Sequence, residues 1–340
     1  MPRLDEIYVA TRTRNVEDAG TPDAPSLLLS RAGQDLLEIP LEGDSDGLGT
    51  GRAAVFRFNI ADQAIDSEGL ELRLLAGGDN AWAPEDVIVW GISGRLPREV
   101  VVPLAAQLEL ASPVTPASGG TWLSTDTDEG VRSLALRPVG PGTRTMRAWR
   151  FIAIFVTEPY PGFEPGGGPG PTAGKLSDVG TEGPVILQAG GPGRLCLSYQ
   201  IPKTPQGDLS KGRANYYEAD LAAPFSRADV EGGIFTLTIG SGDWWIPVYC
   251  AVFGLDTTFG QTNALIPFVH APAISLERMS ADPAEGWHTN GLPHALVAMP
   301  VPPLPGGVVG GVLEPMANSA AKGSGAKRKV LVLRVNRKRS

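Results

Sequence analysis

Short apolar runs recur roughly every ten residues through the first half of the chain. In one of them the polar residues Arg57 and Asn59 alternate with Phe56, Phe58 and Ile60, a pattern that predicts a half-buried strand. Regular short strands separated by turn residues are typical of an antiparallel β-sandwich. The strands that we predict here are residues 7–11, 26–30, 36–41, 53–60, 70–75, 87–92, 99–103, 132–137 and 149–156.

The chain also repeats itself. Landmark residues recur in the same order at an offset of 160 to 165 positions, which indicates two copies of one fold. The matching pairs are Asp18 and Asp178, Gly51 and Gly212, Asp79 and Asp243, Trp82 and Trp245, Gly91 and Gly254, and Trp122 and Trp287.

A Pro/Gly-rich stretch at 159–171 interrupts the chain between the two copies and predicts a linker. We therefore expect one sandwich at 1–158 and a second, divergent one at 172–340. Residues 151–156 are apolar throughout, which favours a central strand of the first copy. Their expected counterpart is 330–335, near the end of the chain.

Composition agrees with an all-β protein built of two tandem antiparallel β-sandwiches. Apolar residues make up 42% of the 340 positions, and 43 glycines and 31 prolines favour short strands and turns over long helices. Residues 1–15 lack the apolar core of a signal peptide, and no stretch approaches the length of a membrane span. These features favour a cytoplasmic or particle-associated protein. Cys196 and Cys250 lie in apolar runs and are expected to be free thiols.

The formal charge of −8 is unevenly distributed. Residues 322–340 contain eight basic residues and no acidic one, so that 1–321 carry 21 basic and 37 acidic residues, a charge of −16. Nucleic acid or anionic lipid could be attracted only by this terminal segment, where Lys327, Arg328 and Lys329 are candidate contact residues. Because an apolar run follows them, we predict that 330–335 is a strand rather than part of a disordered arm.

The first copy resembles the PLAT (lipoxygenase-homology) domain along nearly its whole length. The segments that carry the resemblance are Ala19-Gly20-Thr21-Pro22-Asp23, Gly51-Arg52, the strand at 55–60, Gly78-Asp79-Asn80-Ala81-Trp82, the strand at 86–89, and Trp122-Leu123 followed by an acidic loop and Arg132. The chain departs from the family pattern at Pro22, which displaces the loop aspartate, and lacks the family's loop histidine.

The resemblance implies a non-enzymatic docking module for a protein partner or a lipid surface. Some members of the family hold calcium with loop carboxylates, and Asp18, Asp23, Asp79 and Asn80 could supply such ligands if their two loops meet. The alternative is that these residues only cap turns. The adjacent Trp244 and Trp245 should point to opposite faces of a strand, so at least one is a candidate for partner binding.

Two other functions remain open. A compact duplicated sandwich with a basic terminal segment also suits a structural component of a large assembly, such as a virus or phage particle. An enzyme is disfavoured because His270, His288 and His294 all lie in the second copy, and His288 and His294, six residues apart, have no third ligand of metal-site type nearby.

Overall fold

The structure is a computed structural model. It describes residues 2–42, 48–94, 99–110, 122–157, 163, 180–191, 194–202, 209–210, 212–231, 233–240, 244–256, 264–272, 279–282 and 296–301. The predicted strand at 330–335, the basic residues Lys327, Arg328 and Lys329, and nearly all of the stretch 159–171 lie outside these ranges.

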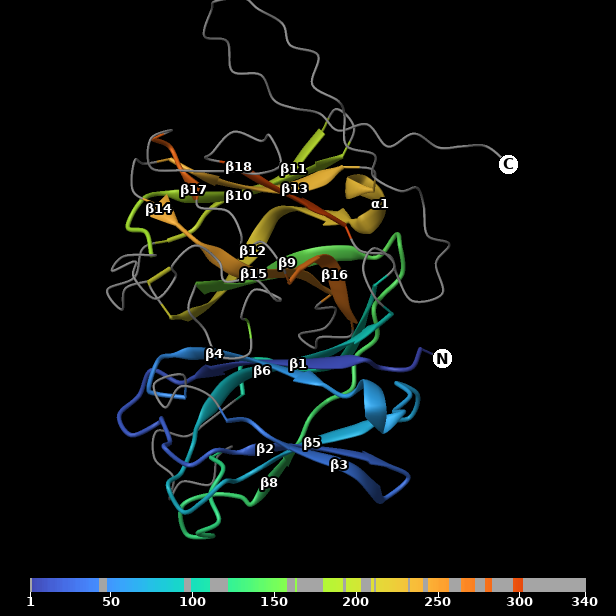
Figure 1. The fold of residues 1–340 in the computed structure, drawn as a ribbon, viewed down its shortest axis with the longest axis vertical. Coiled ribbons are helices and arrows are strands. Elements are labelled where there is room, and N and C mark those ends of the chain that lie inside the picture. The colour runs from blue at the N-terminus through green and yellow to red at the C-terminus, as the bar shows by residue number, and fades with distance from the viewer. Residues whose placement is uncertain are drawn as a thin grey trace, which may run out of the picture.

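Antiparallel strands form four stacked layers (Figure 1). The strands of the first repeat are β1 (Glu6–Thr13), β2 (Ser26–Arg31), β3 (Gln34–Pro40), β4 (Ala53–Asn59), β5 (Glu71–Leu75), β6 (Pro84–Ser93), β7 (Val100–Gln107) and β8 (Ser133–Ala135), with a 3-10 turn, η1 (Ala61–Gln63), after β4. Those of the second repeat are β9 (Arg147–Thr157), β10 (Val185–Gly191), β11 (Arg194–Gln200), β12 (Ala214–Ser226), β13 (Ile234–Ile239), β14 (Trp244–Trp245), β15 (Pro247–Asp256), β16 (Ala264–Ala271), β17 (Met279–Ser280) and β18 (Leu296–Pro300), with the one-turn helix α1 (Arg227–Val230) after β12.

The two repeats have the same strand order. The first repeat contributes an outer sheet β3-β2-β5-β8 and an inner set β4-β1-β6-β7, and the second contributes β11-β10-β13-β18 and β12-β9-β15-β16 in matching order. All nine strands predicted in the first half of the chain are present, and the prediction of an all-β fold of two antiparallel sandwiches is confirmed.

Matching hydrogen bonds identify the equivalent positions. The backbone N–H of Thr13 donates to the carbonyl of Arg52 at 2.8 Å, and that of Thr157 donates to the carbonyl of Arg213 at 2.9 Å. Gly51 and Gly212 precede these arginines, and both have a left-handed φ, of 69° and 66°. The strand β9 is therefore the equivalent of β1, at an offset of 144 residues.

This equivalence corrects the predicted division of the chain. The last strand assigned to 1–158 is β9, which pairs with β12 and β15 of the second repeat rather than with a strand of the first. The second repeat therefore begins at β9. The stretch 159–171 lies between β9 and β10, inside the second repeat, and is not a linker between the two. The prediction that 151–156 is central to its sheet is confirmed, but in the other repeat.

The match of Trp122 with Trp287 is also wrong. Trp82 forms an isolated bridge with Leu123, and Trp245 pairs with Met279. The hydroxyl of Ser124 accepts from the N–H of Asp126, and that of Ser280 accepts from the N–H of Asp282. The equivalent of Leu123-Ser124 is therefore Met279-Ser280, whereas Trp287 lies outside the described residues.

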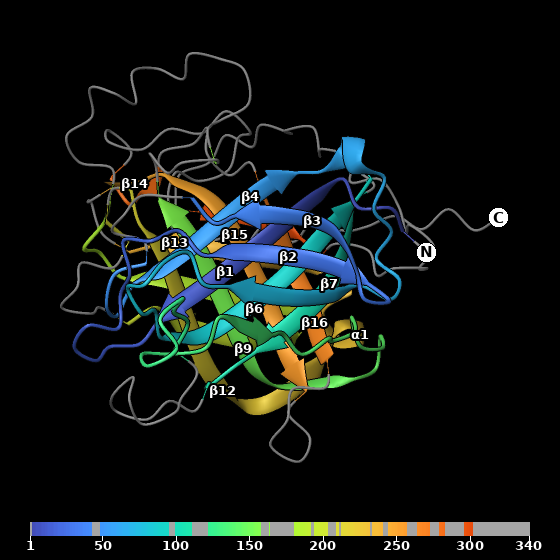
Figure 2. The same cartoon turned by 90° about the horizontal axis from the view of Figure 1, so that it is seen from below.

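The two inner sets join into one eight-stranded sheet that folds over, so that its halves face each other. Ala53 of β4 pairs with Ala214 of β12 at one seam. At the other seam, the carbonyls of Arg137 and Gly140 accept hydrogen bonds from Ala106 of β7 and Leu265 of β16. Seen along the stack, the strands of the two halves cross obliquely (Figure 2).

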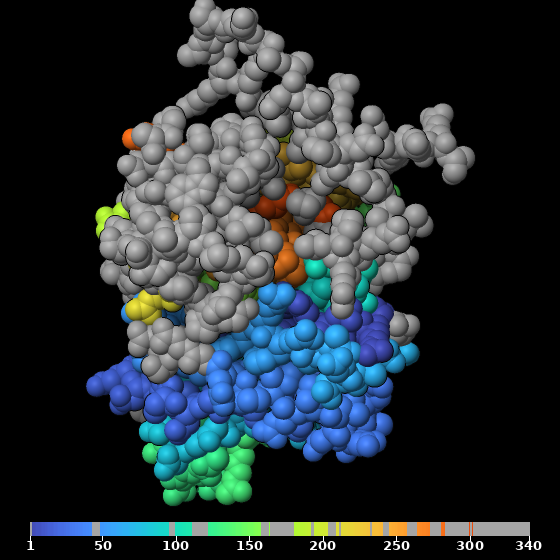
Figure 3. Space-filling model, viewed as in Figure 1, coloured from blue at the N-terminus to red at the C-terminus, as the bar shows by residue number. Residues whose placement is uncertain are grey.

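The inner strands β6, β7, β9, β15 and β16 are consequently buried on both faces along most of their length, which explains runs such as 151–156. Phe151, Ala153 and Phe155 face the core of the second sandwich. Ile152, Ile154 and Val156 face the core between the repeats, which also contains Tyr8, Trp90, Tyr249 and Phe253. In the space-filling view the residues of the first repeat, blue to green, form the lower part of the molecule (Figure 3).

Candidate functional site

The two loops that were expected to supply calcium ligands do meet at one end of the first sandwich. Oδ2 of Asp23 accepts hydrogen bonds from the backbone N–H of Asn80 at 3.1 Å and from its side-chain amide at 2.8 Å. The hydroxyl of Thr21 donates to the Asn80 carbonyl at 3.0 Å. Asp23 therefore holds the loops together by binding amide donors, which is the behaviour of a turn-capping residue.

The other two candidate ligands are placed differently. Asp18 is exposed and has a left-handed φ of 58°, and Asp79 is exposed while its carbonyl accepts from the Ser124 hydroxyl at 2.9 Å. Within the described ranges no group of three or more His, Cys, Asp or Glu side chains could hold a metal ion. The structure thus joins Asp23 to Asn80 but does not assemble the four candidates into a ligand set.

The candidate tryptophans also separate. Trp245 is fully buried, and its indole N–H donates to the Thr157 hydroxyl at 2.9 Å. Its prediction as a partner-binding residue is therefore wrong, because the side chain fills the core of the second sandwich. Trp82 is also buried, and its indole N–H donates to the Thr13 hydroxyl at 2.9 Å. The backbone of Trp244 pairs with Ser280, and its side chain is not described.

A different tryptophan lies on the surface. Trp149, near the start of β9, is 54% exposed. The paired strand β12 carries a wide bulge at this point, because Arg150 pairs with Asp220 and Ala148 with Phe225. The four residues of β12 that lie between these pairs, 221–224, are Leu, Ala, Ala and Pro, all exposed or half-exposed. Trp149 and this bulge form an apolar surface that we call the Trp149 patch.

The Trp149 patch was not predicted, although the sequence contains signals for it. A proline within a strand marks a bulge or an edge, as Pro224 does in β12. At the correct offset of 144, the residue of the first repeat that is equivalent to Trp149 is Asp5. Asp5 accepts a hydrogen bond from the N–H of Gly94. An exposed aromatic residue in one copy and a charged residue in the other distinguishes the repeats.

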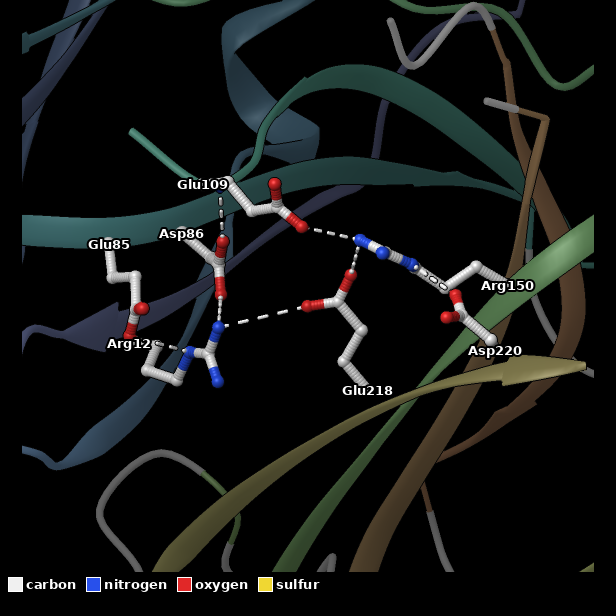
Figure 4. A network of polar contacts seen from close by, with 7 residues as sticks. All are labelled: Arg12, Glu85, Asp86, Glu109, Arg150, Glu218 and Asp220. Atoms are coloured by element: carbon white, nitrogen blue, oxygen red, sulfur yellow. Dashed lines mark hydrogen bonds and ion pairs between the residues drawn. The ribbon is translucent and has the colours of Figure 1, made fainter. Parts of the chain in front are cut away.

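A network of ion pairs connects the two repeats (Figure 4). It is adjacent to the Trp149 patch in the chain, because Arg150 follows Trp149 and Asp220 precedes Leu221. Arg150 is at its centre: Nη1 lies 2.6 Å from Glu109 and 2.8 Å from Glu218, and Nε lies 2.8 Å from Asp220. Glu109 and Asp220 are 66% and 78% exposed, so they form the outer rim of the network.

The inner part of the network surrounds Arg12. Its Nη2 lies 2.6 Å from the buried Asp86 and 3.7 Å from Glu218, and its Nε lies 3.2 Å from Glu85. Burial raises the pKa of Asp86 despite the nearby Arg12, and burial together with the charge of Asp86 raises the pKa of Glu218. Burial therefore disfavours the charged form of both carboxylates, and the nearby arginines offset part of this free-energy cost.

One histidine falls within the described residues. The His270 side chain is 1% exposed, and its ring lies edge-on to Tyr8 and Tyr249 in the core between the repeats, with Nδ1 3.6 Å from Glu99. The other two, His288 and His294, lie outside the described ranges, so their roles stay untested.

No protein-family model matches this sequence, and no curated protein matches it. Among solved structures, the chain is similar to the alpha toxin from Clostridium absonum, with 15% identity and a TM-score of 0.30 over 40% of this chain and 32% of the toxin. It is also similar to a LOX chain solved in complex with arachidonate, with 19% identity and a TM-score of 0.25 over 42% of this chain and 17% of that one. The chain thus spans less than a third of the length of each. Among the described residues, no helix is long and apolar enough to cross a membrane.

Proposed function

We propose that this protein is a non-enzymatic docking protein that binds a protein partner through the Trp149 patch. The observation that carries the proposal is the exposure of Trp149 beside the apolar bulge of β12. Tryptophan and arginine are the residue types that most often dominate binding energy at protein interfaces, and Trp149 is adjacent to Arg150. An apolar centre with a charged rim is also the usual arrangement of such interfaces.

The charge of the chain favours a basic partner. Residues 1–321 carry a formal charge of −16, and Glu109 and Asp220 expose carboxylates beside the patch. A lipid surface rich in anionic headgroups would be repelled by these groups, so the proposal favours a protein with apolar and basic side chains. Calcium held by the loops at Asp23 and Asn80 is a separate proposal; it predicts a higher melting temperature in millimolar calcium that Asp79→Ala abolishes.

Calorimetric titration with a synthetic peptide of alternating leucine and lysine tests the Trp149 patch. We expect binding that weakens as salt increases, and that weakens at least fivefold in Trp149→Asp, the residue of the equivalent place in the first repeat. Leu36→Asp is the matched control, because Leu36 is 38% exposed on β3, in the outer sheet of the first repeat.

The competing functions give different results. Pelleting of the protein with phosphatidylserine vesicles, unaffected by Trp149→Asp, would contradict the proposal and favour lipid docking. A particle of very high mass during native isolation would favour the structural component of a large assembly.

A further inference from the structure

The two repeats face each other as the subunits of a two-fold dimer do. Ala53 and Ala214, which occupy equivalent positions, pair with each other across one seam. Trp90 and Phe253 are also equivalent, because Pro103 and Pro267 lie opposite them at matching bulges, and their rings meet at 5.1 Å. Contact between equivalent residues is the property of an isologous interface. The interface between the repeats therefore has a pseudo-two-fold axis.

One ion pair is reversed between the repeats. In the first repeat Glu6 of β1 accepts from Arg57 of β4, with Oε1 2.6 Å from Nη2. The equivalent positions are Arg150 of β9 and Glu218 of β12, where Nη1 lies 2.8 Å from Oε1. The same pairing of strands is thus retained with the acid and the base exchanged.

The two ion pairs face different surroundings across the interface. Glu218 lies 3.7 Å from Arg12 of the other repeat. Arg57 lies on the other side of the pseudo-two-fold axis. There Val156 is the equivalent of Arg12, and Tyr249 is the equivalent of Asp86. If two first repeats faced each other, Arg57 would occupy the place of Glu218 and would bring a second guanidinium to Arg12. Like charges placed together in an interface oppose association.

We propose that Arg12 and Glu218 make the inner face of the first repeat select the second repeat as its partner, in preference to another copy of itself. The reversed ion pair provides the selection, because only the second repeat carries an acid at the position that meets Arg12. The other pair, Glu6 and Arg57, stabilises the first repeat, and Arg57 supplies the like charge that would oppose the pairing of two first repeats.

Two substitutions at equivalent positions test the proposal in the full chain. Glu218→Arg recreates the charge pattern of two facing first repeats, and Arg57→Glu is the matched control that recreates that of two second repeats. Each leaves a like charge beside its own strand partner, but only Glu218→Arg also meets Arg12. We expect Glu218→Arg to lower the Tm by roughly 3–6 °C more than Arg57→Glu does.

Repeating both substitutions in an Arg12→Gln background identifies the cause. The loss of Tm caused by Arg12→Gln itself is common to both variants and cancels. The difference in Tm between Glu218→Arg and Arg57→Glu should therefore fall to less than half of its value in the presence of Arg12. An equal loss from both substitutions, or a difference that Arg12→Gln leaves unchanged, would overturn the proposal. If Glu218→Arg does not fold, Glu218→Gln with Arg12→Gln serves as a double-mutant cycle. Non-additive changes in Tm then support the proposal, and additive changes overturn it.

Discussion

The indole N–H of Trp245 donates to the hydroxyl of Thr157 at 2.9 Å, deep in the second sandwich. Trp82 donates to Thr13 at the same distance in the first. In each repeat the bond connects the last residue of an inner strand, β1 or β9, to a tryptophan that lies two residues before the start of β6 or β15. These two bonds fix the same corner of the fold and supply the clearest evidence that the repeats share one design.

Loss of either hydroxyl should destabilise the protein. Thr157→Val keeps the shape of the side chain but leaves the buried indole N–H without an acceptor, which costs about 1–3 kcal/mol of unfolding free energy. Thr13→Val should cost a similar amount. Urea denaturation measures both, and Thr157→Ser, which retains the hydroxyl, should lose clearly less. Equal losses from valine and serine would mean that packing, rather than the hydrogen bond, matters here.

The turn at Gly51 should not tolerate a side chain. Its φ of 69° is left-handed, and an added Cβ would lie 2.9 Å from Oδ1 of Asn15. Gly51→Ala should cost about 1 kcal/mol or more from the backbone alone. Gly33→Ala is the control for conformation without crowding, because Gly33 has a φ of 79° and nothing within 4 Å of a Cβ. A smaller loss at Gly51 than at Gly33, measured in urea, would contradict the close contact.

The stability of the first repeat should depend on the charge of Glu6. Burial works to raise the pKa of Glu6, but hydrogen bonds from Arg57 and Tyr8 outweigh it, and the pKa is lowered from its ordinary value of 4.5. A carboxylate with a lowered pKa stabilises the fold above its unfolded-state pKa and loses that contribution as the pH falls through the folded value. Glu6→Gln should therefore cost about 1 kcal/mol at pH 7. The cost should shrink as the pH falls below about 4.5. Unfolding curves between pH 3 and 7 measure this difference, and a constant cost across that range would refute the linkage.

The two thiols should react at very different rates. Cys250 is fully buried, and burial raises the pKa of its thiol, so little of the reactive thiolate is present. Cys196, on β11, is only half-buried. In the native protein a thiol-specific disulfide reagent should label one cysteine quickly and the second only on unfolding. Cys196→Ser should remove the fast phase; its persistence would show that Cys250 is accessible.

The end of the chain carries an untested prediction. If 330–335 forms a strand within the protein or with a neighbouring copy, deletion of 326–340 should lower the Tm of the second repeat or disrupt the assembly. An unchanged Tm together with loss of salt-sensitive nucleic-acid binding would favour a disordered basic arm instead.

The strands could be predicted from the sequence because each is short, apolar and bounded by turn residues. The boundary between the repeats could not, because β1 and β9 share almost no residues and are recognised as equivalent only through Thr13, Thr157 and their hydrogen bonds. The landmarks that revealed the duplication all follow the stretch 159–171, so their common offset concealed its position inside the second repeat. At the candidate site, the meeting of Asp23 and Asn80 followed from the pattern. The Trp149 patch did not, because its exposure depends on a bulge in a strand that lies 70 residues away in the chain.

The inner core between the repeats has a consequence for synthesis on the ribosome. The first sandwich can close once the chain has passed Arg137, but the strands that cover its inner face end with β16 at Ala271. At about 5–20 residues per second, roughly 7 to 27 s elapse before that cover is complete. During this interval we expect Tyr8, Ile88 and Trp90 to be exposed on the nascent chain as an apolar surface of the kind that chaperones bind. Synthesis of the protein is therefore expected to pass through a partly folded intermediate whose apolar inner face is open to aggregation.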